Sequence, residues 1–240
     1  MRIALAAALL ALAACRADTG AVKADLPELY VLTSLPLLFD EGFAAGPATG
    51  EAAVFLRAHY RLRPIDLPSQ LPPRATLLAA QPRALPAEEL VALDKWVRGG
   101  GRMLLLADPM LEWPSERALG DRLRPPMAYP DTGLLAHWGL RLDAPDVRGV
   151  RSVSYDGFGL DYLSPGKLVR LGDGCEVSKD GVLATCSLGN GNVTIAADAD
   201  LLNVAAVAAA LGRRTDNLNI VQLQLMALPS RRGESCPIRN

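Results

Sequence analysis

Two kinds of hydrophobic pattern alternate along the chain between residues 28 and 228. Short continuous apolar runs are typical of buried strands in a parallel sheet. They occur at 28–33, 75–80, 102–107 and 192–197, with weaker strand signals at 62–67 and 140–142. Segments with helical spacing cover 51–60, 85–98, 133–138, 201–211 and 216–228. Strands that alternate with helices in this way predict an α/β fold with a mostly parallel sheet.

The clearest unit is a strand, a helix and a second strand between residues 75 and 109. Pro86 and the acidic pair that follows it mark a helix start, since proline and negative charge suit the first turn. Leu90, Leu93 and Val97 lie at helical spacing, and the three glycines at 99–101 end the helix. We expect a βαβ unit with a right-handed crossover.

Residues 148–191 differ in character, with short alternating segments and glycine turns. They predict an antiparallel, β-rich insertion in the α/β domain. Asp180-Gly181 is a strong hairpin signal, and a two-residue loop there places Cys175 opposite Cys186. Cβ atoms in such a pair lie about 4.5–5.5 Å apart, against roughly 3.8 Å in a disulfide. The spacing predicts a Cys175–Cys186 disulfide, and two half-buried thiols are the alternative.

The N-terminal apolar stretch, residues 3–14, is too short to span roughly 30 Å of hydrocarbon as a helix. It follows Arg2 and ends in Leu12-Ala13-Ala14-Cys15, which resembles the lipobox of bacterial lipoproteins. The resemblance implies cleavage before Cys15 and acylation of that cysteine. The alternative is an ordinary secretory peptide that leaves Cys15 free. No aspartate follows Cys15, which favours the outer membrane over the inner one.

These features predict a division of the chain into four parts. They are a signal peptide at 1–14, a lipidated cysteine with a tether at 15–27, one α/β domain at 28–229 and a polar tail at 230–240. Export to the periplasmic face of a bacterial membrane permits disulfides. The role of Cys236, in the tail, stays open.

Composition excludes several classes of protein. Half of the residues are hydrophobic, which rules out a disordered or low-complexity chain. The formal net charge is −1, and the arginines are scattered without a basic run. We therefore expect no nucleic-acid partner. The cysteines lack zinc-ligand spacing, and no cofactor is expected.

Acidic residues follow two of the expected central strands. Asp108 ends one strand, and Asp198 and Asp200 end another. Because the latter two are two residues apart, we expect them to face the same side of that strand. In open α/β folds, ligands bind at the carboxyl ends of the strands, and carboxylate oxygens suit Mg²⁺ or Ca²⁺. Asp108, Asp198, Asp200 and Asn203 are thus the candidate ligand or metal site. The alternative is structural, with Asp200 capping the next helix and Asp108-Pro109 forming a turn.

Nucleophilic catalysis has little support in the sequence. An amidotransferase-like enzyme needs a nucleophile at a strand–helix elbow and a histidine nearby. Ser34 follows the first strand, and only His59 and His137 could serve as its base. We expect structural roles for both histidines and name no catalytic residue.

Two blocks of the chain resemble a known family. They are Ala75–Ala80 with the helix at 85–96 and the Gly99-Gly100-Gly101 strand ending at Asp108-Pro109, and the later Gly189-x-Gly191 strand ending in Asp-x-Asp-Leu-Leu. They resemble the auxiliary domain of gliding-motility-type ABC transport systems and the related DUF4350-like domains. The resemblance implies a flavodoxin-like, class I glutamine-amidotransferase-like fold and a role in or beside a transport or envelope complex. Transporter-linked members carry membrane helices, and none is expected here after the signal peptide.

The sequence thus predicts an exported, lipid-anchored and non-catalytic domain that binds a ligand or a partner. The partners would be subunits of an ABC-type transport or envelope assembly. Two alternatives remain. One is a periplasmic hydrolase, with or without a metal, that uses the sheet-edge carboxylates. The other is a purely structural envelope lipoprotein.

Overall fold

The structure is a computed structural model that describes residues 26–41, 46–155 and 158–227. The expected signal peptide, Cys15 and most of the tether lie outside the described residues, as do the polar tail and Cys236. Within the described ranges, no helix combines the length and the apolar character needed to cross a bilayer.

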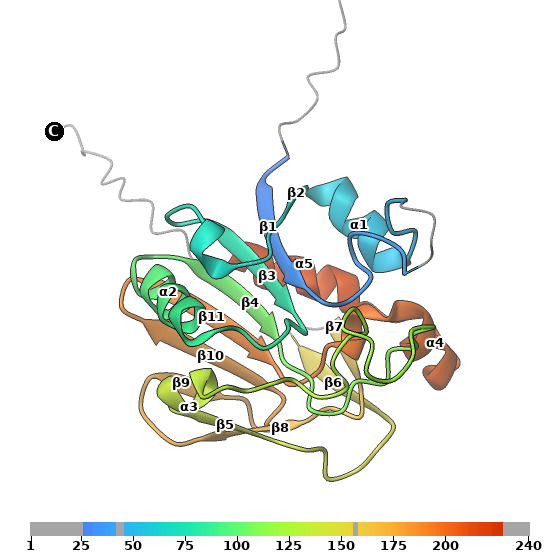
Figure 1. Ribbon diagram of the computed structural model, residues 1–240. Coiled ribbons are helices and arrows are strands. Elements are labelled where there is room, and N and C mark those ends of the chain that lie inside the picture. The colour runs from blue at the N-terminus through green and yellow to red at the C-terminus, as the bar shows by residue number, and fades with distance from the viewer. Residues whose placement is uncertain (1–25, 42–45, 156–157, 228–240) are drawn as a thin grey trace, which may run out of the picture.

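A seven-stranded sheet forms the centre of the fold (Figure 1), in the order β2-β1-β3-β4-β11-β10-β9. Its strands are β1 (Glu28–Thr33), β2 (Arg61–Pro64), β3 (Thr76–Ala80), β4 (Arg102–Leu106), β9 (Cys175–Val177), β10 (Leu183–Leu188) and β11 (Gly191–Ala196). The first five strands in the order pair in parallel, and β10 and β9 extend the sheet in antiparallel fashion. A mixed α/β fold with a mostly parallel sheet is therefore confirmed.

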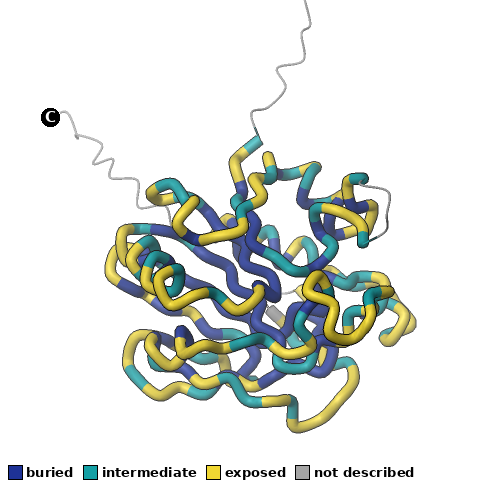
Figure 2. The backbone as a smooth tube through the Cα atoms, in the orientation of Figure 1, coloured by how far each residue is buried: buried dark blue, intermediate teal, exposed yellow. Residues whose placement is uncertain are grey.

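Helices cover both faces of the sheet, which explains the continuous apolar strands. In Figure 1, α2 (Ala87–Arg98) lies in front of the sheet and α5 (Asn217–Ala227) lies behind it. Helices α1 (Glu51–His59) and α4 (Val204–Leu211) pack against each other beside α5. All five residues of β3 are buried, and the central strands are dark along their length in Figure 2. A strand enclosed on both faces has no polar side to present.

Helix α2 has the limits that its sequence predicts. Pro86 occupies the N-cap position, and Leu93 and Val97 of the apolar stripe are buried. Gly99 caps the C-terminal end, and Gly100 has a φ of +109°, which favours glycine. A Cβ at Gly101 would lie 2.5 Å from the Trp96 ring. The glycine run therefore both ends the helix and lets β4 start directly beneath it.

Most of the remaining strands lie in the part of the chain that was expected to be β-rich. Strand β6 (Val150–Tyr155) pairs with β7 (Phe158–Leu163), and β5 (Leu140–Asp143) pairs with β8 (Lys167–Arg170). Both pairs are antiparallel, and a short helix, α3 (Leu134–His137), precedes β5. Strands β6 to β10 thus fall between residues 148 and 191, although β9 and β10 join the main sheet. The proposed division of the chain into domains stays a prediction.

The predicted hairpin register is confirmed. Cys175 and Cys186 are directly opposite on β9 and β10, and they form a disulfide. The turn between the strands closes with Gly181 N–H donating to the Ser178 carbonyl, 2.9 Å, and Gly181 has a φ of +75°. Counting outward from a glycine turn was therefore enough to find the pair.

Two predicted elements differ in the structure. The helix expected at 201–211 is divided into a 3-10 helix, η2 (Asp200–Leu202), and α4. The division occurs because the side chain of Asn203 accepts a hydrogen bond from Ala206 N–H and so begins a new helix. The strand expected at 62–67 is shorter, since β2 ends at Pro64 and the 3-10 helix η1 (Pro68–Gln70) follows.

We expect the disulfide to stabilise the fold measurably. Replacing both Cys175 and Cys186 by alanine should lower the free energy of unfolding by about 2–4 kcal/mol, because the unfolded chain regains the entropy of the closed loop. Urea unfolding of the purified wild-type and double-variant proteins, with the wild type kept free of reductant, measures the change. Peptide mapping without reductant should join residue 175 to residue 186, and free thiols at both positions would contradict the assignment.

Candidate functional site

Polar side chains line the carboxyl edge of the parallel sheet. Strand β1 ends at Thr33, whose hydroxyl donates to the Ala80 carbonyl at 2.7 Å, and the hydroxyl of Ser34 donates to the Gln81 carbonyl at 2.5 Å. Asp108 follows β4 and Asp198 follows β11. Parallel strands bring their carboxyl ends to one edge, so residues far apart in the sequence meet there.

Asp108 connects the end of β4 to the segment after β11. Its side chain is fully buried. Oδ1 accepts from Met110 N–H at 2.7 Å, and Oδ2 accepts from Ala199 N–H at 3.0 Å. The first bond shapes the turn at residue 109, and the second joins that turn to the segment after β11.

Asp198 connects the end of β7 to η2 in a similar way. It is also fully buried. Oδ2 accepts from Leu163 N–H at 2.7 Å, and Oδ1 accepts from Leu201 N–H at 3.1 Å. The second bond caps the 3-10 helix, while the first holds the end of β7 against the main sheet.

Asp200 completes the group from within η2. Its Oδ2 accepts from Glu112 N–H at 2.6 Å, which fixes the loop that follows β4. Its Oδ1 is buried without a hydrogen-bond donor. One carboxylate oxygen from each of Asp108, Asp198 and Asp200 lies within 4.8 Å of the others.

Burial raises the pKa of all three carboxyl groups above the ordinary aspartate value. For Asp200 the pKa rises to about 7, because of burial and the negative charges of Asp108 and Glu112. Burial, with the charges of Asp108 and Asp200, raises the pKa of Asp198 well above its usual range. Burial also raises the pKa of Asp108, although the backbone N–H donors to that group oppose the shift. Three neighbouring negative charges cannot persist here without a proton or a cation.

The cluster can therefore hold protons, or a divalent cation of the kind that prefers carboxylate oxygens. Either would act inside the protein, since all three side chains have no exposed surface. The backbone hydrogen bonds already engage every carboxylate oxygen except Oδ1 of Asp200. The arrangement best fits an anchor for the loops at this edge, while its use as a ligand or metal site stays a prediction.

The structure brings together three of the four predicted site residues, though for a different reason than expected. Strand β11 ends at Ala196, so Asp198 and Asp200 do not lie on one strand face. Asp198 follows the strand, and Asp200 belongs to η2. The fourth residue, Asn203, caps α4 through its Oδ1. The cap expected from Asp200 is therefore supplied by Asn203.

Gln81 is a residue of this edge that the sequence analysis missed. It is fully buried and has a φ of +43°. Its Oε1 accepts from Asp108 N–H at 2.9 Å, and its Nε2 donates to the carbonyls of Asp108 and Pro126, both at 3.0 Å. The sequence did contain a signal for Gln81. Like Asp108, it is a polar residue that comes just after an apolar strand, at the carboxyl edge of the sheet. Gln81 holds the backbone of Asp108 in position.

The candidate nucleophile and its possible bases are engaged separately. The Ser34 hydroxyl donates to Gln81, as described above. His59 Nδ1 lies 2.9 Å from the Phe55 carbonyl, and His137 Nε2 lies 3.4 Å from an oxygen of Asp94. Among the residues that the structure describes, no hydrogen bond joins Ser34 to either histidine.

We expect the unfolding free energy to depend on pH through Asp200. Its pKa is about 7 in the folded protein against an ordinary 3.8, so the folded state binds more protons between these values. The stabilising contribution is complete below the lower value and is lost as pH rises through the upper one, a loss on the order of 4 kcal/mol. Asp200→Asn mimics the protonated side chain and should make this decline shallower.

Urea unfolding at about pH 5 and about pH 8 measures the effect. Asp66→Asn is the matched control, because Asp66 is exposed and should leave the pH slope unchanged. Equal slopes in the wild-type and Asp200→Asn proteins would show that Asp200 is ionised throughout this range.

Several solved structures are similar to this chain at low identity. The mmIFT52 N-terminal domain is 13% identical, with 84% of this chain and 96% of that one covered, at a TM-score of 0.49. The exo-beta-1,4-mannosidase Op5Man5 from Opitutaceae bacterium strain TAV5 is 13% identical at a TM-score of 0.49, and this chain spans 35% of its length. Cytoplasmic Protein STM3548 from Salmonella typhimurium is 11% identical, with 85% and 99% covered, at 0.48. Scores of this size carry no conclusion about function.

Sequence comparison gives a firmer result. No curated protein matches the chain. The model of the family described as "ABC-type uncharacterized transport system" matches residues 27–152, which is more than half of the chain and runs from β1 into β6. By this match, the chain belongs to the family of auxiliary domains of ABC-type transport systems.

Proposed function

We propose that this protein is a non-catalytic accessory domain that binds partner subunits of an ABC-type transport assembly at the bacterial envelope. The observation that carries the proposal is the family match over residues 27–152. The burial of Asp108, Asp198 and Asp200 supports it, because carboxyl groups that no substrate can reach serve poorly in hydrolysis. For the same reason, the alternative of a hydrolase at the sheet edge has less support.

We further propose that the fold is flavodoxin-like. The five parallel strands have the spatial order β2-β1-β3-β4-β11, which corresponds to 2-1-3-4-5 when the parallel strands alone are numbered. This is the strand order of flavodoxin-like sheets. The antiparallel β10 and β9 would then be an extension at one edge.

Partner binding is supported by exposed apolar side chains on the long loop after β4. Leu119, Leu123 and Met127 are 77%, 60% and 59% exposed. The loop is nevertheless held in place, since the Arg83 guanidinium donates to the carbonyls of Leu123 and Arg124 at 2.8 and 2.9 Å. Large apolar side chains on an ordered loop are typical of a protein interaction site. We propose this loop as a contact surface for a partner subunit.

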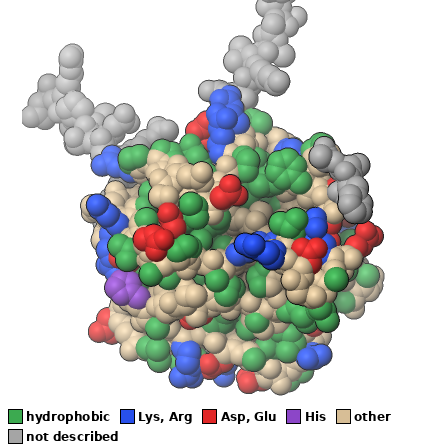
Figure 3. Space-filling view, in the orientation of Figure 1, with side chains coloured by type: hydrophobic (Ala, Val, Ile, Leu, Met, Phe, Trp, Pro, Cys, Tyr) green, Lys and Arg blue, Asp and Glu red, His purple; other side chains and the backbone are tan. Residues whose placement is uncertain are grey.

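The surface gives no comparable support for nucleic acid as the partner. On the face shown in Figure 3, Lys and Arg side chains are dispersed among acidic and hydrophobic ones. A nucleic-acid interface instead gathers basic side chains into a continuous patch or stripe.

The partner proposal predicts co-purification with transporter subunits. Crosslinking in native cells, followed by detergent extraction and affinity purification of the tagged full-length protein, should recover an ATPase or permease subunit. The triple variant with Leu119, Leu123 and Met127 changed to serine should reduce the recovery severalfold, because the proposed contact loses its apolar area. Val147→Ser, at a position that is 78% exposed but outside this loop, is the control. Recovery of no envelope protein would contradict the proposal.

The anchor proposal predicts acylation of Cys15. The mature N-terminal peptide should begin at Cys15 and carry a diacylglyceryl thioether and an N-acyl chain, because several acyl chains give stable membrane attachment. Mass spectrometry of the membrane fraction measures this modification, and Cys15→Ala should prevent it. An unmodified Cys15 in a soluble protein would instead indicate an ordinary secretory peptide.

A further inference from the structure

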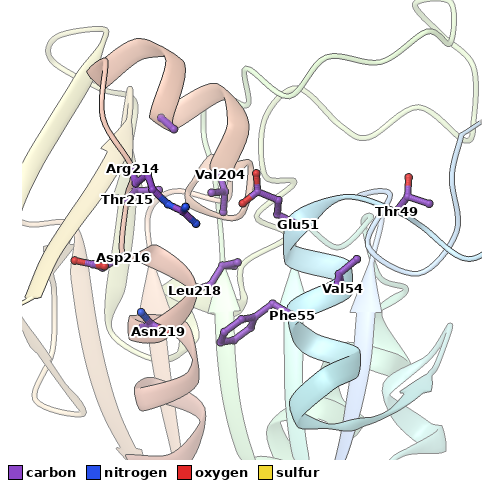
Figure 4. A pocket seen from close by; sticks show the side chains of 11 residues that line it. Thr49, Glu51, Val54, Phe55, Val204, Arg214, Thr215, Asp216, Leu218 and Asn219 are labelled. Atoms are coloured by element: carbon purple, nitrogen blue, oxygen red, sulfur yellow. The ribbon is translucent and has the colours of Figure 1, made fainter.

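A cavity of about 680 Å³ lies between α1, α4 and the start of α5, away from the carboxyl cluster. Its apolar lining includes Val54 and Phe55 of α1, Val204 of α4 and Leu218 of α5. In Figure 4, the Leu218 side chain and the Phe55 ring both extend into the space between α5 and α1, below Glu51 and Arg214, and we call these two side chains the floor of the cavity. The volume falls within the range of about 300–1,000 Å³ that is typical of small-molecule sites.

Three charged residues line the cavity, namely Glu51, Arg214 and Asp216. The carboxylate of Asp216, the residue before α5, points away from the other two in Figure 4, so two opposite charges remain above the apolar floor. Glu51 is the first residue of α1, and Arg214 lies in the link between α4 and α5. Figure 4 shows the carboxylate of Glu51 and the guanidinium of Arg214 facing each other across the cavity. Both residues are exposed.

Neither charge is engaged by the protein itself. Within residues 26–41, 46–155 and 158–227, no ion pair or hydrogen bond involves the side chain of Glu51 or of Arg214, although the Arg214 carbonyl accepts from the Arg213 guanidinium at 2.9 Å. The neighbouring Arg213 is different, because its guanidinium binds the buried Asp161 carboxylate at 2.7 Å. Arg213 therefore has a structural role, whereas the Arg214 guanidinium at the mouth of the cavity can bind a ligand.

We propose that this cavity binds a short apolar peptide with free termini. The α-ammonium group would pair with Glu51 and the terminal carboxylate with Arg214, whose fork of N–H donors suits carboxylates. The peptide side chains would pack against Phe55 and Leu218. Glu51 and Arg214 carry opposite charges at the same rim, above an apolar floor. A zwitterion can pair with both of them, whereas a molecule with a single charge can pair with one.

The proposed ligand is a small molecule and not a partner subunit, so it goes beyond the proposed function. The binding experiment is independent of the partner experiment. Binding is measured on the purified full-length protein, without other envelope components, so either proposal can fail while the other survives.

Isothermal titration with the dipeptide Leu-Phe tests the proposal. We expect saturable binding, with about a fivefold loss of affinity when either terminus is blocked, as for partly exposed ion pairs. N-acetyl-Leu-Phe removes the ammonium group, and Leu-Phe-amide removes the carboxylate. Free leucine, titrated in parallel, should bind more weakly because it fills less of the apolar floor.

The variants assign each terminus to its residue. Arg214→Gln should bind Leu-Phe and Leu-Phe-amide equally, while Glu51→Gln should bind Leu-Phe and its N-acetyl form equally. Arg148→Gln and Glu88→Gln are the controls, because both residues are exposed and Glu88, like Glu51, lies in the first turn of a helix. They should behave as the wild type does. The proposal would be overturned if Leu-Phe showed no saturable binding. It would also be overturned if the wild type bound N-acetyl-Leu-Phe and Leu-Phe-amide as tightly as Leu-Phe.

Discussion

Three carboxyl groups without exposed surface hold the carboxyl edge of this protein together. Asp108 joins the end of β4 to the segment after β11, Asp198 joins that segment to β7, and Asp200 joins it to the loop that contains Glu112. Each bond spans at least 35 residues of sequence. An ionised carboxylate is costly to bury, and burial raises the pKa of all three groups, so a proton or a cation held by the cluster would lower that cost.

The rest of the architecture depends on this junction. The β6–β7 pair meets the main sheet through Leu163 and Asp198, and the loop after β4 is fixed through Glu112 and Asp200. That loop displays the apolar side chains that we propose as a partner contact. The buried carboxyl groups thus position the loop that carries the proposed contact surface, which agrees with the proposed accessory role in a transport assembly.

Much of the fold could be predicted from local pattern. Helix α2 combines an apolar stripe with proline and acidic residues at its start and glycines at its end, so its limits follow from the sequence. The register of β9 and β10 followed from Asp180-Gly181 taken as a two-residue loop, because such a loop fixes the pairing of the strands on both sides. Helix boundaries did not follow from the apolar pattern where a side chain forms a cap inside an expected helix. Asn203 does so, and it divides one expected helix into η2 and α4.

The sequence by itself determined the alternation of strands and helices, the disulfide partners and the meeting of Asp108 with Asp198 at one edge of the sheet. These depend on periodicity, turn chemistry and the common direction of parallel strands. Only the tertiary structure decided that the aspartates are buried anchors, that Gln81 supports them, and that Glu51 faces Arg214 across a cavity. Burial and long-range contact arise from packing between elements, which no local pattern of residues encodes.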